Sequence, residues 1–497
     1  MKNGRYLPWV LALSLVTPLA AVVPAQAAEE WVDVIENRAP VGSEAVSVDE
    51  YGGFEKYSSR EVAVFQGPGD YESWNCESGN TSRGDCDLSR PEHSFSANAI
   101  LSFCETAAQE NCVEGLEIGP AGGTLEPARF VRHVNSRTYP EIRSQGLMAG
   151  GATSLFESSV LHSGGTGTYA ATVVAQVGYD RLKRVFRAES LNVAVYGYVE
   201  DKNPSHDITY ITTGKTRDGK ERRQLGFGAP SKCKWIEKGA CGLERAFAPG
   251  IEVKLIMRVP DTITGWFRGR LKAPQIALSQ FSSKNTRVIV QAEPVQISRM
   301  YSVVQEKDVT QKQRDAIWAN CGSCTMFKGG GRSIPFSHWG EFNYIELFRN
   351  NAKDTAATTT SHWSFSTIDN ASGNPCLASK SKLLGIVTTN ATMYNGIVPA
   401  FRNGQLNYEV SGMHYQPDGS LSLGTYDLVM RSEVARCLYG FSQAPLNAKV
   451  SIVNDKGERF TATTVVGEKN GWLRLAAYGF TFSQKTIKVK ISQKKKR

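Results

Sequence analysis

The tripeptide Ser-His-Trp occurs twice in the sequence, and its side chains could bind a ligand or a metal ion. Ser337-His338-Trp339 and Ser361-His362-Trp363 lie in a stretch that is rich in aromatic side chains. Indoles beside polar groups can stack on sugar rings, and two imidazoles on neighbouring strands can bind a metal ion. Because tryptophan is usually mostly buried, we favour the alternative that both indoles lie in a core and both imidazoles are satisfied by hydrogen bonds. The candidate binding residues are therefore kept as a hypothesis: His338, Trp339, His362 and Trp363.

The pair Cys321-Gly322-Ser323-Cys324 has the spacing of a redox motif. In thioredoxin-like folds the first cysteine of such a motif lies at a helix N-terminus, which lowers its pKa. Here the predicted helix ends before Cys321 and no βαβ unit surrounds the motif, so we interpret it as structural. A zinc site with Cys376 and Cys437 has enough ligands, but an oxidising compartment argues against it. We expect no metal and no cofactor.

The remaining catalytic motifs are incomplete. Gly214-Lys215-Thr216 lacks the first glycine of a phosphate loop, because Thr209 occupies that position. Gly440-Phe-Ser442-Gln-Ala444 ends in alanine where a nucleophile elbow has glycine, and no α/β alternation surrounds it. Glu341 and Glu346 lie near the aromatic stretch, so a carbohydrate-active hydrolase with an aromatic cleft is the alternative that we retain. The sequence favours a binding protein over an enzyme.

The first 27 residues have the features of a secretory signal peptide. Lys2 and Arg5 precede an apolar run, and Ala25-Gln26-Ala27 is a cleavage site of the A-x-A type. The apolar run is too short for a membrane span, which needs about 20 apolar residues. We therefore expect a protein at the cell surface or outside the cell, without a membrane span.

Ten cysteines remain after the signal, an even number that predicts disulfides in an exported protein. Their spacing predicts local bridges within three pairs: Cys76 with Cys86, Cys104 with Cys112, and Cys233 with Cys241. The last four can pair as Cys321–Cys324 and Cys376–Cys437, or they can cross-pair, and the sequence does not decide between these connectivities.

Hydrophobic periodicity divides the chain into three parts after the signal. Residues 28–150 are loop-rich, although Ser96–Gln109 has the pattern of a short helix with Ser96 as its N-cap. Residues 151–308 alternate apolar and polar side chains, as in Leu191–Val199, and this alternation predicts half-buried strands of an antiparallel sandwich. Residues 309–497 begin with a helix at Thr310–Asn320, which carries a capping box, and continue as strands.

The last segment has the clearest strand pattern, with a hairpin turn at Asn470-Gly471. It predicts four strands of a second sandwich or half-barrel. The expected fold is therefore mainly β, with two antiparallel sandwich-like domains, a disulfide-stapled N-terminal region and a few short helices.

Basic residues are concentrated at the C-terminus of a chain whose formal net charge is +9. Lys485–Arg497 holds seven basic residues and no acidic one, which suits contact with an anionic polymer. The alternative is a solvated edge strand with a frayed tail. The candidate contact residues at the end of the chain are Lys494, Lys495, Lys496 and Arg497.

Two segments have a distinctive sequence. The first is Arg258–Lys272, which includes Gly265-Trp-Phe-Arg-Gly-Arg270 and is followed by Arg287–Pro294, and the second is Asp427–Ile491, which includes Gly471-Trp-Leu-Arg-Leu475. Together they resemble a group of large exported actinobacterial proteins that has no assigned activity. The resemblance implies an exported, β-rich protein and transfers no functional residue.

Taken together, these observations predict a non-enzymatic surface or extracellular protein. Its expected partner is an anionic envelope polymer or carbohydrate rather than a nucleic acid, and a structural surface-layer subunit is a further alternative.

Overall fold

The computed structural model describes residues 41–49, 60–66, 74–75, 93–134, 138–202, 210–215, 221–225, 233–237, 240–319, 326–327, 330–335, 344–368, 373–379, 381–395, 398–442, 446–453, 459–460, 462–482 and 485–493. Within these ranges the fold is mainly β, as the sequence predicts, and it contains three α-helices.

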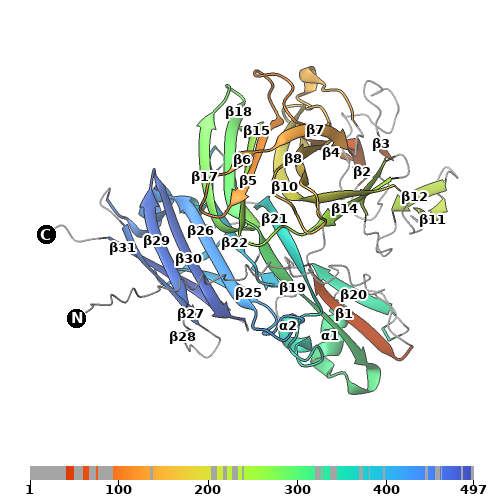
Figure 1. The fold of residues 1–497 in the computed structure, drawn as a ribbon, viewed down its shortest axis with the longest axis vertical. Helices are drawn as coiled ribbons and strands as arrows, with labels where there is room; N and C mark the ends of the chain where they lie inside the picture. The colour runs from red at the N-terminus through yellow and green to blue at the C-terminus, as the bar shows by residue number, and fades with distance from the viewer. Residues whose placement is uncertain are drawn as a thin grey trace, which may run out of the picture.

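One sheet of 18 strands runs through the molecule. Smaller sheets lie beside it (Figure 1). Its neighbours are antiparallel except for two parallel pairs, β16 with β22 and β1 with β20. In ladder order its main path is β3 (Trp74–Asn75), β2 (Arg60–Gln66), β4 (His93–Ile100), β9 (Thr168–Asp180), β10 (Val185–Asp201), β21 (Thr358–Ile368), β16 (Gly265–Arg270), β22 (Leu383–Thr389), β26 (Leu423–Arg431), β30 (Trp472–Thr481) and β29 (Thr463–Lys469). Branches from this path are β7 (Arg129–Val134) and β8 (Thr153–Glu157), β13 (Cys233–Glu237) and β14 (Ala240–Arg245), and β19 (Val295–Gln305), β1 (Ser43–Asp49) and β20 (Gly330–Pro335).

A five-stranded sheet packs on one face of the long sheet and forms the first sandwich. Alternate residues of β9, β10 and β21 supply one side of this first core, and those of the smaller sheet supply the other. The strands of the smaller sheet are β17 (Lys272–Gln280), β18 (Asn285–Glu293), β15 (Ile251–Pro260), β5 (Cys112–Pro120) and β6 (Glu126–Pro127).

A six-stranded sheet packs on the opposite face of the long sheet and forms the second sandwich. Two consecutive residues of β16 point into the two different cores. Trp266 belongs to the second core and Phe267 to the first, and both are fully buried, because successive side chains of a strand point to opposite faces. The strands of this sheet are β23 (Met393–Tyr394), β24 (Ala400–Arg402), β25 (Gln405–Ser411), β31 (Lys485–Gln493), β27 (Leu446–Val453) and β28 (Arg459–Phe460).

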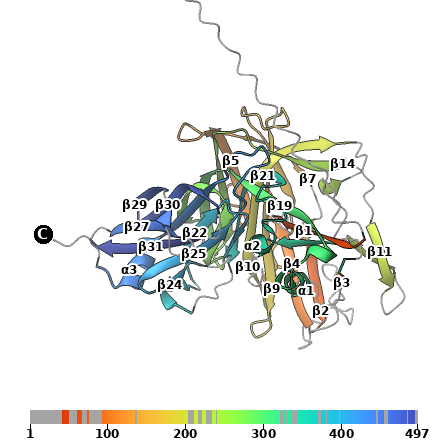
Figure 2. The same ribbon diagram turned by 90° about the horizontal axis from the view of Figure 1, so that it is seen from below.

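A third, smaller core joins strand β1 to two short helices, α1 (Gln311–Ala319) and α2 (Tyr344–Phe348) (Figure 2). The helix predicted at Thr310–Asn320 is confirmed as α1, with its capping box. The Gln313 side chain accepts a hydrogen bond from the backbone N–H of Thr310 at 3.0 Å, and the Thr310 hydroxyl accepts one from the backbone N–H of Gln313 at 3.3 Å. The remaining short elements are α3 (Ser432–Tyr439), η2 (Arg143–Gln145), η3 (Glu306–Asp308), η4 (Pro375–Leu377) and the hairpin β11 (Tyr210–Lys215) with β12 (Glu221–Leu225).

The helix predicted at Ser96–Gln109 is wrong, because its first residues belong to strand β4. Phe95, Ala97 and Ala99 are buried with a period of two, and Ser96 lies opposite Gly178 of β9. The backbone hydrogen bonds of a neighbouring strand therefore decide a segment whose local propensity allows a helix.

Strand β10 is buried on both faces rather than half-buried as its alternation predicts. Leu191, Val193 and Val195 lie in the first core, whereas Tyr196 and Tyr198 lie in a separate apolar cluster on the other face. Alternation shows that a strand has two faces, but it does not show whether the second face is covered.

Strand pairs cross both boundaries that the sequence suggests, near residues 150 and 308. β4 and β5 pair with β9 and β15, and β10 and β16 pair with β21 and β22. The strands predicted near the C-terminus also separate. β29 and β30 extend the long sheet, and β27 and β31 belong to the six-stranded sheet that faces it.

Among the described residues no helix combines the length and the apolar character that a bilayer span requires.

Candidate functional site

The second of the two tripeptides lies in the protein interior. Trp363 is 1% exposed within the first core, and its indole N–H donates a hydrogen bond to the carbonyl of Ala292 at 3.0 Å. His362 is also buried, with its Nε2 atom 2.7 Å from the hydroxyl of Thr360. Trp363 therefore presents no indole face to a ligand. The first tripeptide, including His338 and Trp339, lies outside the described residues.

Other aromatic residues of this stretch are also packed in cores. Tyr344 and Phe348 belong to the third core, and Phe365 belongs to the first. These three side chains therefore do not line a cleft. The hydrolase alternative requires an aromatic cleft, and the described part of the stretch does not form one.

Two disulfides are present among the described residues. Cys104 is bonded to Cys112, as its spacing predicts, with a Cα–Cα distance of 5.1 Å. Cys376 is bonded to Cys437, which is one of the pairings that the sequence left open. Cys76, Cys86, Cys321 and Cys324 lie outside the described residues, and for Cys233 and Cys241 only the backbone is described.

The Cys104–Cys112 loop is held against the first sandwich by a charged clamp. Nε of Arg258 and Nη2 of Arg287 donate to the carboxylate of Glu114 at 3.1 and 2.8 Å. Arg258 also donates to loop carbonyls, including that of Gln109 at 2.8 Å. Burial alone would raise the pKa of Glu114, but the hydrogen bonds from the two arginines outweigh burial and lower it. The clamp fixes the loop, and we assign it a structural role.

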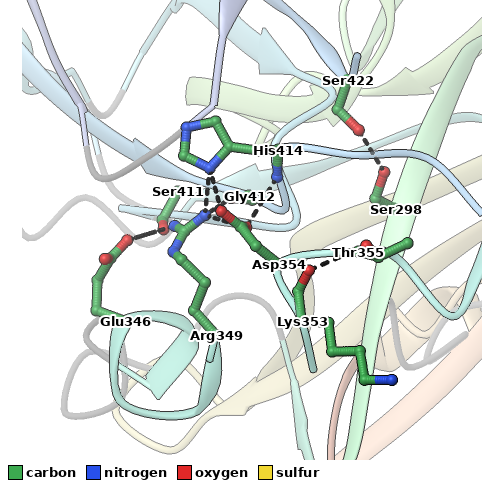
Figure 3. Close-up of polar contacts among 10 residues, drawn as sticks. All are labelled: Ser298, Glu346, Arg349, Lys353, Asp354, Thr355, Ser411, Gly412, His414 and Ser422. Atoms are coloured by element: carbon green, nitrogen blue, oxygen red, sulfur yellow. Dashed lines mark hydrogen bonds and ion pairs between the residues drawn. The ribbon is translucent and has the colours of Figure 1, made fainter. Parts of the chain in front are cut away.

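A cluster of polar side chains surrounds His414, which follows strand β25 (Figure 3). Nδ1 of His414 is hydrogen-bonded to the carboxylate of Asp354, and the same carboxylate accepts a bond from Arg349 at 2.7 Å. Arg349 also donates to the carboxylate of Glu346 and to the carbonyl of Gly412. Burial would raise the pKa of Asp354, but hydrogen bonds from His414 and the charge of Arg349 lower it.

A carboxylate that orients an imidazole is half of a catalytic triad, so the surroundings of this pair decide its role. In Figure 3 the second ring nitrogen of His414 points away from the other side chains drawn. The nearby serine hydroxyls have other partners: Ser411 donates to Glu346, and Ser422 contacts Ser298. Among the described residues no set of three metal-ligating side chains converges. The cluster joins the segment after α2 to the segment after β25, and this is a structural role.

Asp354→Asn is expected to lower the free energy of unfolding by about 2 kcal/mol, because it removes the carboxylate that the buried Arg349 and His414 share. Urea unfolding monitored by tryptophan fluorescence measures the change. Asp308→Asn, at an exposed residue of η3, is the matched control and should leave stability unchanged. Equal stabilities of the two variants would contradict a structural role for the cluster.

The outer face of the six-stranded sheet carries three lysines, and we call Lys449, Lys488 and Lys490 the lysine face. Lys449 of β27 lies directly opposite Lys490 of β31, and Lys488 is two residues before Lys490. Lys449 and Lys490 are exposed and Lys488 is half-buried. No ion pair joins any of the three to another described residue. Their inward neighbours Val450, Ile487 and Val489 lie in the second core, which fixes the direction of the lysines.

The interpretation of the C-terminal strand as a sheet edge is wrong. β31 pairs with β25 on one side and with β27 on the other, so it lies inside its sheet (Figure 2). Its lysines are therefore not needed to protect an exposed edge from other strands. The last four basic residues, Lys494–Arg497, lie outside the described residues.

Sequence reasoning identified the alternation of lysines with apolar residues in β27 and β31, but not that the two lysine rows are adjacent. It missed Arg349, Asp354 and His414 altogether. These three residues form no motif along the chain, since Asp354 and His414 are 60 positions apart.

No protein-family model matches the chain, and no curated protein is recognisably similar to it. The chemistry of the described residues is therefore the ground for assigning a function.

Proposed function

We propose that this protein is an exported binding protein that holds an anionic polymer of the cell surface on its lysine face. One observation carries the proposal. Lys449 and Lys490 lie opposite each other on neighbouring strands, Lys488 is beside them, and none of the three has an acidic partner among the described residues.

The register brings these charges close together. Side chains that lie directly opposite in an antiparallel pair have Cβ atoms about 5 Å apart, and like charges in this position are destabilising. Lys488 follows about 7 Å further along the same face. A polyanion would offset the repulsion of all three ammonium groups at once. Lysine suits this contact, because its ammonium group is a compact positive charge that binds phosphate groups well.

Other features support an extracellular site of action. The N-terminal signal pattern and the two disulfides suit an oxidising compartment outside the cytoplasm. The basic net charge favours association with anionic surfaces in general. The resemblance to exported actinobacterial proteins agrees with this location.

The triple variant Lys449→Gln, Lys488→Gln, Lys490→Gln should bind an anionic polymer more weakly than the native protein. The mature chain is applied to phosphocellulose at about 0.1 M salt and eluted with a gradient toward about 1 M, over which the screening length falls from roughly 10 to 3 Å. We expect the triple variant to elute at a clearly lower salt concentration, with plain cellulose retaining neither protein.

The matched control removes the same charge elsewhere. Lys284, Lys307 and Lys312 are exposed residues that lie outside the six-stranded sheet, and their combined replacement by glutamine gives the same net charge. This variant should elute close to the native protein. Identical elution of the two triple variants would show that retention depends on net charge alone, and it would overturn the proposal.

A further inference from the structure

Long edge strands of this fold differ in how they are protected against pairing with another chain. Among the described strands, β7 pairs only with β8 and carries Arg129 and Arg132, and β17 pairs only with β18 and contains Pro274. Charge and proline are common devices that protect sheet edges. β29 ends the long sheet beyond β30, and its two charged residues, Glu468 and Lys469, lie beside the turn. Its residues Thr463–Val466 have neither device. Four consecutive β-branched residues instead give this segment a strong preference for strand pairing.

The hairpin turn determines which backbone groups of β29 point away from β30. Asn470 and Gly471 have φ angles of +52° and +78°, which identify a two-residue turn of type I′. In such a hairpin the flanking residues, Lys469 and Trp472, form a hydrogen-bonded pair, and hydrogen bonding then alternates along the strand. The N–H and C=O groups of Thr464 and Val466 therefore point outward, and no described residue accepts or donates to them.

Side-chain exposure gives an independent indication at the same place. Val466 lies opposite Leu475, a fully buried residue of the second core, yet 39% of Val466 is exposed. The apolar core is thus open along the edge that β29 forms. A strand added beyond β29 would cover Val466 and satisfy the outward backbone groups together.

We propose that β29 pairs antiparallel with β29 of a second copy of this chain, about a twofold axis at Val465. Thr464 of each copy then forms a hydrogen-bonded pair with Val466 of the other, which uses all four outward groups of these residues in each copy. Val465 lies opposite Val465 of the second copy as a non-hydrogen-bonded pair. Glu468 lies opposite Ala462, so no like charges meet, and the interface is self-complementary as a twofold contact requires.

Two copies joined in this way would carry two lysine faces. A polymer bound to one lysine face would meet the second face at a high effective concentration. It would therefore bind the dimer more tightly, although no new kind of contact forms. This consequence rests on the proposed function, whereas the pairing of β29 does not, so the test below contains no polymer.

Val465→Cys should produce a covalent dimer when the purified mature protein is oxidised. A non-hydrogen-bonded antiparallel pair has a Cα–Cα distance of about 4.5 Å, which is within the range that a disulfide spans. Thr463→Cys is the matched control on the same face of β29. In this register the two copies of Thr463 are offset by about 13 Å, so they should not be linked. The readout is the fraction of dimer on a non-reducing gel.

Thr464→Pro tests the non-covalent contact. It removes an outward N–H and leaves the ladder between β29 and β30 intact, so the protein should keep its melting temperature but sediment as a monomer. The native protein should sediment increasingly as a dimer as its concentration rises. A native protein that stays monomeric at every concentration, or equal crosslinking at Thr463→Cys and Val465→Cys, would overturn the proposal.

Discussion

Trp266→Ala is expected to lower the free energy of unfolding by about 3–5 kcal/mol, which is the usual cost of truncating a large buried aromatic side chain. Trp266 is fully buried in the second core, and its indole N–H donates to the carbonyl of Leu377 at 2.9 Å. The substitution leaves a cavity and also an unpaired buried carbonyl, and both effects act in the same direction. Chemical unfolding of the native and variant proteins measures the difference.

The neighbouring residue supplies the matched comparison. Phe267→Ala should cost a similar free energy, but it empties space in the first core. Amide hydrogen exchange separates the two effects. Trp266→Ala should accelerate exchange chiefly in β25 and β31, and Phe267→Ala chiefly in β15 and β18. If both variants accelerate exchange in the same strands, the two sandwiches do not have separate cores on opposite faces of one sheet.

The second large effect is a loss of stability as the pH falls from about 6.5 to 4, caused mainly by His162. This side chain is 4% exposed, and burial is the first reason that the pKa of its imidazole is lowered to about 4. The charge of Arg245 acts in the same direction, whereas a hydrogen bond with the carbonyl of Tyr198 opposes it. Tyr169 packs edge-on against the ring and adds no charge.

A hydrogen bond to the imidazole ring also favours the neutral form of His162. The backbone N–H of Gly164 donates to Nδ1 of His162 at 3.0 Å, so this nitrogen carries no proton in the folded protein. Nε2 carries the proton and lies 2.9 Å from the hydroxyl of Thr166. A second proton on Nδ1 would point at the N–H of Gly164 and break this contact.

The direction in which stability changes with pH follows from the difference in proton binding between the folded and unfolded states. Below pH 6.5 the unfolded chain takes up a proton at His162 and the folded protein does not, so stability is complete above this pH and falls as the pH is lowered. The loss ends near pH 4, and its upper limit is about 3 kcal/mol. The lowered pKa values of Glu114 and Asp354 give stability that is lost as the pH falls from the usual carboxylate pKa to below it, so most of their effect falls in a more acidic window.

Urea unfolding at pH 7, 6 and 5 measures this dependence. His162→Asn should be less stable than the native protein at pH 7, because it loses part of the hydrogen-bond set, but its stability should change less with pH. His133→Asn is a useful comparison, since burial also lowers the pKa of His133 but its ring is less buried. Parallel curves for the native protein and His162→Asn would show that another group controls the acid response.

Features that depend on a few neighbouring residues can be predicted from the amino-acid sequence alone. The capping box at Thr310 and Gln313 specifies the start of α1, and Asn470-Gly471 specifies the turn before β30, since their side chains or φ angles act within one turn. The eight-residue spacing of Cys104 and Cys112 allows a bridge without reference to the rest of the fold. Alternating apolar residues in β15 and β31 identify strands because their period is a property of the extended chain.

The neighbours of each strand and the elements that cover each face of a sheet depend on the complete fold. The segment beginning at Ser96 is extended because β9 lies beside it, and β31 is an interior strand because β25 and β27 approach it from distant parts of the sequence. The same is true of both candidate sites. Lys449 meets Lys490 through strand register, and Asp354 meets His414 through the packing of two loops. Local patterns contain no information about these partners, because each contact joins residues whose separation along the chain is large and whose proximity depends on the complete fold.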